Sequence, residues 1–136
     1  MKKIKSNLST YCISHKYNKN LDELNLKPIG SGALKNKFPA YWLNDAKGKK
    51  NISKKNFNYG SLTSIYWIWK NDINNLKADD YIGISHYRRF WLKENSSKLV
   101  NTLNLKKNLL TSIPKKYKKY DAFVCSPIKL RGHKLS

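Results

Sequence analysis

The chain has 136 residues and a formal net charge of +20, from 28 Lys and Arg against 8 Asp and Glu. Its hydrophobic share of 40% excludes a disordered chain, and its longest apolar runs are far shorter than the ~18 residues of a membrane span. Since its basic start also lacks the apolar segment of a signal peptide, we expect one soluble, cytoplasmic domain over residues 1–136.

The first third of the chain contains one predicted strand and two predicted loops. Residues 10–14 form a short β-prone run that a polar, asparagine-rich stretch ends, which predicts a strand. Residues 28–33 are punctuated by glycine, and residues 44–58 are almost wholly polar, so we predict loops for both segments.

Residues 61–76 carry the clearest helical pattern, because their apolar positions recur at spacings of three and four. We expect the cluster of Tyr66, Trp67 and Trp69 to belong to the core, with a platform for a sugar as the alternative. Trp67 lies off the main stripe and could line a pocket. The predicted stripe consists of Leu62, Ile65, Tyr66, Trp69, Ile73 and Leu76.

Two more strands and a weaker helix follow. Residues 81–85 and 121–125 are short apolar runs typical of strands, and residues 98–112 have a sparse helical stripe that Pro114 stops. Strands separated by helix-length segments predict parallel βαβ organisation. We therefore expect an α/β fold of three layers, with a mainly parallel sheet and the 61–76 helix on one face.

Each predicted strand is followed by polar or cationic side chains. Open α/β sheets bind ligands outside the carboxyl ends of their strands, and hydroxyl, imidazole and cationic groups that meet there suit a diphosphate. The sequence therefore predicts an anion site at this edge. The groups are His15 and Lys16 after the first strand, His86, Tyr87, Arg88 and Arg89 after the second, and Ser126 and Lys129 after the third.

The second strand end holds two arginines and a histidine with different expected roles. Because side chains alternate along a strand, one arginine is expected to meet the ligand and the other to pair with Asp80 or Asp45. The alternative is that Arg88 and Arg89 both hold loops through salt bridges. His86 is the candidate catalytic residue, as an acid or base near neutral pH or a donor to phosphate, with a structural histidine as the alternative.

Several short motifs follow one another in an order that resembles a known family. They are Asn51-Ile-Ser-Lys-Lys-Asn56, Leu62-Thr63, Tyr66-Trp67-Ile-Trp69-Lys70-Asn71, Asp80-Tyr-Ile-Gly83 and His86-Tyr-Arg-Arg-Phe90. The set covers roughly Ile4 to Lys129. It is similar to a domain-of-unknown-function family of bacterial capsule, exopolysaccharide and O-antigen biosynthesis proteins, whose members are taken to be glycosyltransferases with a GT-A-like fold.

The resemblance implies a nucleotide-sugar donor and a polysaccharide or lipid-linked acceptor, at the inner face of the membrane. It adds Asn51 and Asn56 to the donor-binding candidates. Many GT-A enzymes hold a divalent metal with Asp-x-Asp at the strand end where this chain reads His86-Tyr87-Arg88. We therefore expect fixed cations in place of a metal, and no cofactor.

Two departures from the family pattern bear on activity. Gly60-Ser61 stands where the family usually reads Cys-Glu, so a carboxylate is missing, and family members continue past Ser136. We therefore expect a truncated donor-binding half that is inactive by itself.

The positive charge leaves two other hypotheses open. One is a basic nucleic-acid-binding module, although no RNP, KH, zinc-finger or helix-turn-helix signature accompanies the charge. The other is an inactive remnant whose dispersed lysines reflect only base composition. The densest block, residues 115–119, is interpreted as a solvated loop that can contact acidic lipid head groups.

Overall fold

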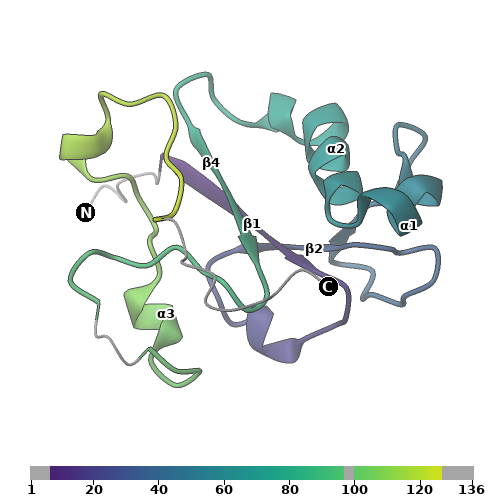
Figure 1. The fold of residues 1–136 in the computed structure, drawn as a ribbon, viewed down its shortest axis with the longest axis horizontal. Coiled ribbons are helices and arrows are strands. Elements are labelled where there is room, and N and C mark those ends of the chain that lie inside the picture. Colours follow the sequence, from purple (N-terminus) through teal and green to yellow (C-terminus); the bar gives the residue numbers. More distant parts are fainter. Residues whose placement is uncertain (1–6, 97–99, 127–136) are drawn as a thin grey trace, which may run out of the picture.

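The computed structural model describes residues 7–96 and 100–126. Within this part, one parallel sheet contains β1 (Leu8–Ser14), β2 (Lys27–Gly30), β3 (Leu43–Asn44) and β4 (Tyr81–His86), in the order β3-β2-β1-β4 (Figure 1). The helices are α1 (Asn56–Tyr59), α2 (Leu62–Asn71) and α3 (Leu105–Asn108). Single turns of 3-10 helix are η1 (Lys19–Leu21), η2 (Ser53–Lys55), η3 (Ile73–Asn75) and η4 (Lys115–Tyr117).

The sheet register places β1 between β2 and β4. Ile13 of β1 lies opposite Ile29 of β2 and His86 of β4, so the last residues of three parallel strands share one edge. This confirms the predicted α/β class and the predicted neighbouring strands at residues 10–14 and 81–85.

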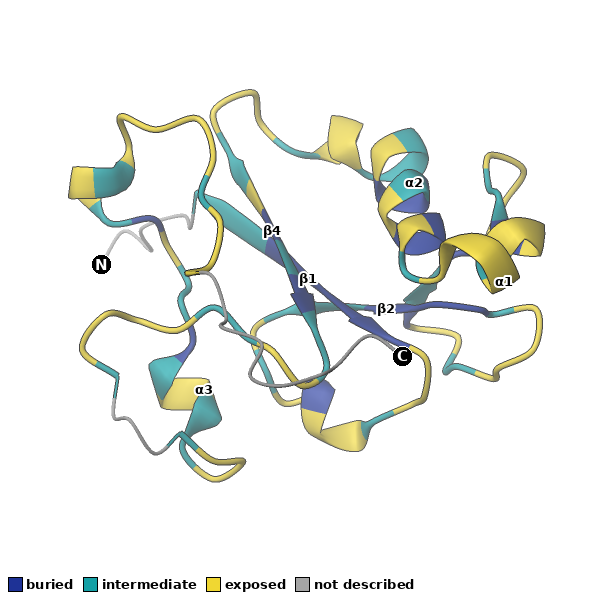
Figure 2. Ribbon diagram, viewed as in Figure 1, coloured by how far each residue is buried: buried dark blue, intermediate teal, exposed yellow. Residues whose placement is uncertain are grey.

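Side chains on one face of the sheet pack against α2. Tyr11, Ile13 and Ile29 form a buried cluster with Trp67 and Ile68 of the helix. Figure 2 shows this buried interior along β1, β2 and the inner side of α2. Burial of these five side chains is the main apolar contribution to the fold on this face.

The opposite face is covered by loops and a single helical turn. Cys12 packs there with Leu21 of η1 and with Trp42, whose ring stacks on Phe38 at 5.8 Å between ring centroids. Only glycine fits at position 30, because a Cβ there would lie 2.4 Å from the Phe38 ring. Loops therefore form the third layer.

The predicted 61–76 helix is confirmed in position, but it turns a different side to the sheet. The expected apolar stripe is largely exposed, whereas Thr63, Ser64, Trp67 and Ile68 are buried. Contacts at both ends of the helix fix this orientation. Thr63 Oγ1 donates to the carboxylate of Asp45 at 2.5 Å, and the Tyr11 hydroxyl donates to Asp72, which ends α2, at 2.6 Å.

Trp67 belongs to the core rather than to a pocket. Its ring packs against side chains of the sheet, and its Nε1 donates to the carbonyl of Lys47 at 2.7 Å. The small side chains of Thr63 and Ser64 are buried on the same side of the helix as Trp67 and Ile68.

Three other predicted elements differ from the structure. Residues 28–33 contain the end of β2 rather than a loop alone. Of residues 100–112, only α3 forms an α-helix, because the Asn101 side chain accepts bonds from the amides of Leu103 and Asn104 and starts a turn instead. Residues 97–99, which include the predicted start of that helix, lie outside the described residues.

The predicted third strand at residues 121–125 is wrong. The segment pairs with no strand, and Phe123 stacks instead on Tyr81, with 5.5 Å between ring centroids. The Tyr81 hydroxyl donates to the carbonyl of Tyr120 at 2.9 Å. The segment is thus held at the start of β4, at the opposite end from the carboxyl edge where Ser126 and Lys129 were expected. Lys129 lies outside the described residues.

Candidate functional site at the carboxyl edge of the sheet

The ends of β1 and β4 meet at the predicted edge. The amide of Tyr87 donates to the carbonyl of Ile13 at 3.1 Å, which extends the β1 to β4 pairing by one residue. The His15 ring then meets the Tyr87 ring edge to face, with 5.2 Å between centroids. Lys16 follows with an exposed side chain, and the contact between His15 and Tyr87 brings the residues after these two strands together.

A tight turn carries the two arginines. The amide of His86 donates to the carbonyl of Arg89 at 3.1 Å, and the amide of Arg89 donates to the carbonyl of His86 at 2.8 Å. The Arg88 guanidinium carbon lies 5.0 Å from the centroid of the Tyr87 ring. Strand alternation therefore stops at His86, and stacking on Tyr87 sets the direction of Arg88.

The expected pairing of an arginine with Asp80 or Asp45 is wrong. Asp80 accepts from the amide of Lys77 at 3.1 Å, and Asp45 is buried among other donors. The ion pairs found among the described residues are Lys27 with Asp72 and Lys116 with Glu94. In this part of the chain, both guanidinium groups lie exposed without a carboxylate partner.

The surroundings of His86 lower its pKa. Partial burial is the largest cause, followed by the electrostatic influence of Arg89 and of His15. The imidazole is therefore neutral at pH 7, where it can donate one hydrogen bond or accept a proton. The fixed positive charge of the edge comes from the arginines.

Asp45 is the centre of a buried network beside this edge. Its carboxylate is fully buried and accepts from the amides of Gly32 and Ala33, both at 2.9 Å. It also accepts from Thr63 Oγ1 at 2.5 Å and Asn56 Nδ2 at 3.3 Å. Four donors offset the cost of burying the charge and tie the loops after β2 and β3 to the start of α2.

Glycine is required at position 32 for two reasons. Its φ is +74°, and a Cβ would lie 2.9 Å from the side-chain oxygen of Asn56. The loop after β2 can therefore bring its amides to Asp45 only with glycine here.

The side chains of Asn51 and Asn56 both make hydrogen bonds within the protein. Asn56 bridges Asp45 and the hydroxyl of Ser31, to which its Nδ2 donates at 3.0 Å. Asn51 closes the 46–53 loop, donating to the carbonyl of Gly48 and accepting from the hydroxyl of Ser53 at 2.7 Å. Neither is shown in contact with the arginine turn, and their part in donor binding stays a prediction.

A pocket opens beside the arginine turn. It has a volume of about 600 Å³, and its lining includes Tyr87, Arg88, Phe90, Asn20 and Glu23. This volume is within the range of small-ligand sites. A second pocket of about 850 Å³ lies at the opposite end of β4, lined in part by Tyr81 and Phe123, away from the predicted site.

The residues present do not fit the divalent metal that a GT-A-like fold implies. In the described ranges, no three of the His, Cys, Asp and Glu side chains are grouped so that they could hold a metal ion. Asp79 and Asp80 precede β4, and Asp45 is enclosed by its own donors.

Comparison with known proteins places the chain in a family. The chain belongs to the family described as Domain of unknown function (DUF4422), which matches residues 9–133. No curated protein matches the chain.

A solved structure of apo WbbM, described as a bifunctional glycosyltransferase, is similar, with a TM-score of 0.50 and 29% sequence identity. The match covers 69% of this chain and 16% of the WbbM chain, so this chain spans only a small part of that protein's length. The parallel α/β arrangement agrees with the predicted partial GT-A-like fold.

Proposed function

We propose that this chain binds the nucleotide-sugar donor of a glycosyltransferase. Membership of the family and similarity to WbbM support the class of activity. The observation that carries the proposal is the register of β1 and β4, which pairs Ile13 with His86 and so sets His15 and the His86 to Arg89 turn on one edge.

The cationic edge suits the diphosphate of such a donor. Guanidinium groups are always charged and can grip two phosphate oxygens at once, so Arg88 and Arg89 would hold the diphosphate and stabilise it as it departs. Lys16 would add a point charge, and His86 would donate to a phosphate or move a proton. The pocket lined by Tyr87 and Arg88 has room for the nucleoside or the sugar.

The acceptor we infer is a bacterial surface polysaccharide or a lipid-linked glycan. Capsule or exopolysaccharide biosynthesis is the setting that the family resemblance implies. Such an enzyme would work in the cytoplasm, and a lipid-linked acceptor would bring it to the inner face of the membrane. No cofactor beyond the donor is part of the proposal.

Titration with UDP and UMP tests donor binding. Calorimetry at physiological salt should give UDP an affinity about tenfold or more above that of UMP, because the second phosphate adds charge-assisted contacts. Binding should be weak overall, and the chain should release no UDP from UDP-glucose or UDP-galactose, because Ser61 stands where a carboxylate is expected.

Two results would count against this account. Equal affinity for UDP and UMP, with tighter binding of an RNA oligonucleotide that collapses as salt rises, would favour the nucleic-acid-binding alternative. Robust turnover of a UDP-sugar would overturn the expectation that the chain is inactive by itself.

Binding of UDP should also draw a proton onto His86. Arg89 and His15 help keep the pKa of His86 low in the free protein, whereas a diphosphate would favour the charged imidazolium. The affinity should therefore rise as the pH falls through the pKa of the complex. Calorimetry at pH 7 in buffers of different ionisation enthalpy should show proton uptake that is smaller in His86→Gln. Because UDP itself titrates equally with both proteins, identical uptake would show that His86 does not face the diphosphate.

A further inference from the structure

The outer face of α2 is apolar although it is exposed. The α2 stripe, defined as Leu62, Ile65, Tyr66 and Trp69, has the spacing of one helix face. Leu62 is 56% and Trp69 55% exposed, and the Tyr66 and Trp69 rings touch edge to face at 5.7 Å between centroids. Single exposed apolar residues are ordinary, but a continuous stripe marks an interaction surface.

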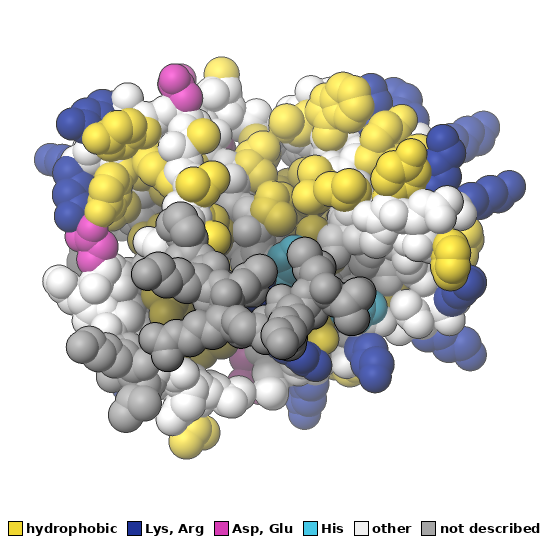
Figure 3. All heavy atoms as spheres, in the orientation of Figure 1, with side chains coloured by type: hydrophobic (Ala, Val, Ile, Leu, Met, Phe, Trp, Pro, Cys, Tyr) yellow, Lys and Arg dark blue, Asp and Glu magenta, His cyan; other side chains and the backbone are white. Residues whose placement is uncertain are grey.

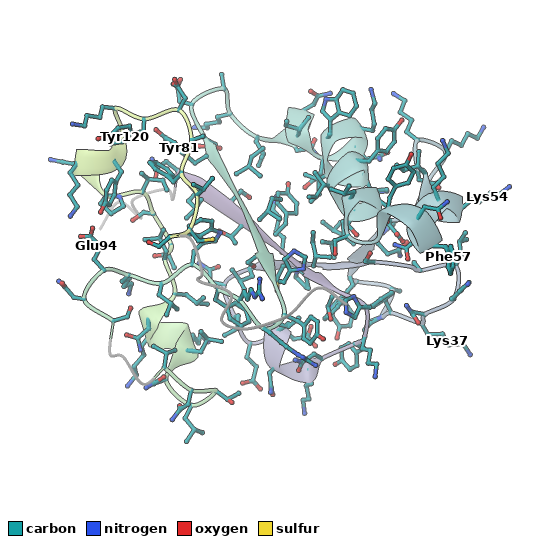
Figure 4. All side chains as sticks on the ribbon, viewed as in Figure 1. Lys37, Lys54, Phe57, Tyr81, Glu94 and Tyr120 are labelled. Atoms are coloured by element: carbon teal, nitrogen blue, oxygen red, sulfur yellow. The ribbon has the colours of Figure 1, made fainter. Side chains whose placement is uncertain are left out.

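Figure 3 shows this surface as a group of hydrophobic side chains over α2, bordered by Lys and Arg. The Lys70 ammonium lies 3.4 Å from the centroid of the Trp69 ring, so a cation lies directly on the stripe. Figure 4 shows Phe57 and Lys54 at the α1 end of the molecule, with Lys37 farther from α1 on the same side of the view. Phe57 is exposed, and the centroid of its ring lies 5.9 Å from the Lys35 ammonium.

The segment that contains the α2 stripe, residues 32–71, exposes charge of one sign. Asp45 is the one acidic residue between positions 32 and 71, and it is fully buried. This stretch therefore presents no carboxylate to solvent. Its eight lysines are Lys35, Lys37, Lys47, Lys49, Lys50, Lys54, Lys55 and Lys70.

The charge and the apolar character of the α2 stripe together indicate what kind of partner binds there. A second copy of the chain would bring an equal set of lysines against these, since a two-fold interface opposes each surface to itself. Nucleic acid would use the lysines and leave the stripe exposed. An anionic lipid surface would use both, because aromatic and aliphatic side chains enter the head-group layer while lysines pair with acidic head groups.

We propose that the α2 stripe and its lysine border dock on an anionic lipid bilayer. No helix among the described residues is long and apolar enough to cross a membrane, so this contact lies on the bilayer surface. The docking surface differs from the 115–119 lysine block expected from the sequence, where Lys116 already pairs with Glu94 at 2.6 Å. The proposal does not depend on donor binding.

Vesicle binding tests the contact directly. The protein should sediment with phosphatidylcholine vesicles that contain phosphatidylglycerol, and bind pure phosphatidylcholine about tenfold or more weakly, with affinity falling as salt rises. Brominated lipid should quench Trp69 but not the buried Trp42 and Trp67, so Trp69→Phe should lose most of the quenching. Unquenched Trp69 in the bound protein would overturn the proposal.

Matched variants separate the stripe from general charge. The double variant Ile65→Ser with Trp69→Ser should weaken vesicle binding about tenfold or more. The control, Leu103→Ser with Val124→Ser, alters side chains that are 94% and 88% exposed elsewhere and should leave binding unchanged. Since all four positions are exposed, near-ultraviolet circular dichroism should show an intact fold in both.

Lysine variants complete the test. Lys54→Gln with Lys55→Gln should weaken binding about 30-fold, as two head-group contacts are lost, whereas Lys115→Gln with Lys119→Gln should change it much less. Equal losses of vesicle affinity in both double variants would show that only the overall positive charge drives binding, and would overturn the assigned surface. A dimer in sedimentation velocity that Trp69→Ser abolishes, without lipid binding by the parent, would make the stripe an interface between copies.

Discussion

Replacing Asp45 by alanine should lower the free energy of unfolding by about 3–5 kcal/mol. The carboxylate is fully buried, and its loss leaves the amides of Gly32 and Ala33 without the acceptor they now use. Each buried donor without a partner costs ~1–3 kcal/mol. Thr63 and Asn56 lose an acceptor as well, so the start of α2 should loosen along with the loop after β2.

Urea denaturation measures this cost. Thr63→Val keeps the side-chain shape and removes one of the four donors, so it should cost about 1–2 kcal/mol. Asp79→Ala is the matched control, since it removes an exposed carboxylate and should stay within about 0.5 kcal/mol of the parent. A change below about 1 kcal/mol in Asp45→Ala would show that the network does not hold these loops together.

The network changes the interpretation of the family motifs. Asn56 and Thr63 lie in motifs that resemble the family pattern, and Asn56 was predicted to bind the donor. In the structure both side chains donate to Asp45. These motif positions therefore shape the loops beside the candidate site, which is a scaffold role that sequence order alone does not distinguish from ligand binding.

The parts of the fold that were predicted from sequence depend on local patterns. β1 and β4 are short apolar runs with clear ends, and α2 has regular helical spacing. β2 was missed because Lys27-Pro-Ile-Gly30 contains two residues that disfavour strands. It becomes a strand through pairing with β1, a tertiary contact that local propensity does not contain.

The converse error occurred at residues 121–125, where a β-prone run has no pairing partner and Phe123 stacks on Tyr81 instead. The orientation of α2 was also wrong, because hydrophobicity favours burying Leu62 and Trp69. Hydrogen bonds at the two ends of the helix, from Thr63 to Asp45 and from Tyr11 to Asp72, accompany burial of the other side.

The meeting of the two strand ends was predicted without any knowledge of the register. The rule that ligands meet the carboxyl ends of parallel strands placed His15, His86, Tyr87 and both arginines at one edge, and their part in donor binding stays a prediction. Asp45 was considered only as an arginine partner. A single acidic residue within a long lysine-rich stretch was the available signal that it had a structural task of its own.

Replacing Arg88 by alanine should weaken UDP binding by roughly 10- to 150-fold, the equivalent of ~1.5–3 kcal/mol for a lost charge-assisted contact. Arg88→Lys should restore only part of the affinity, because lysine keeps the charge and loses the planar fork. Lys49→Ala removes an exposed charge elsewhere and should have little effect, which separates a direct contact from the net charge of the protein.

Calorimetric titration of UDP into the parent, Arg88→Ala and Arg89→Ala, each with and without EDTA, tests the cationic diphosphate site. We expect a loss of affinity in both Arg88→Ala and Arg89→Ala, and no effect of EDTA on the parent. Unchanged affinity in both folded arginine variants, or loss of parent binding on chelation, would contradict a cationic diphosphate site at the end of β4.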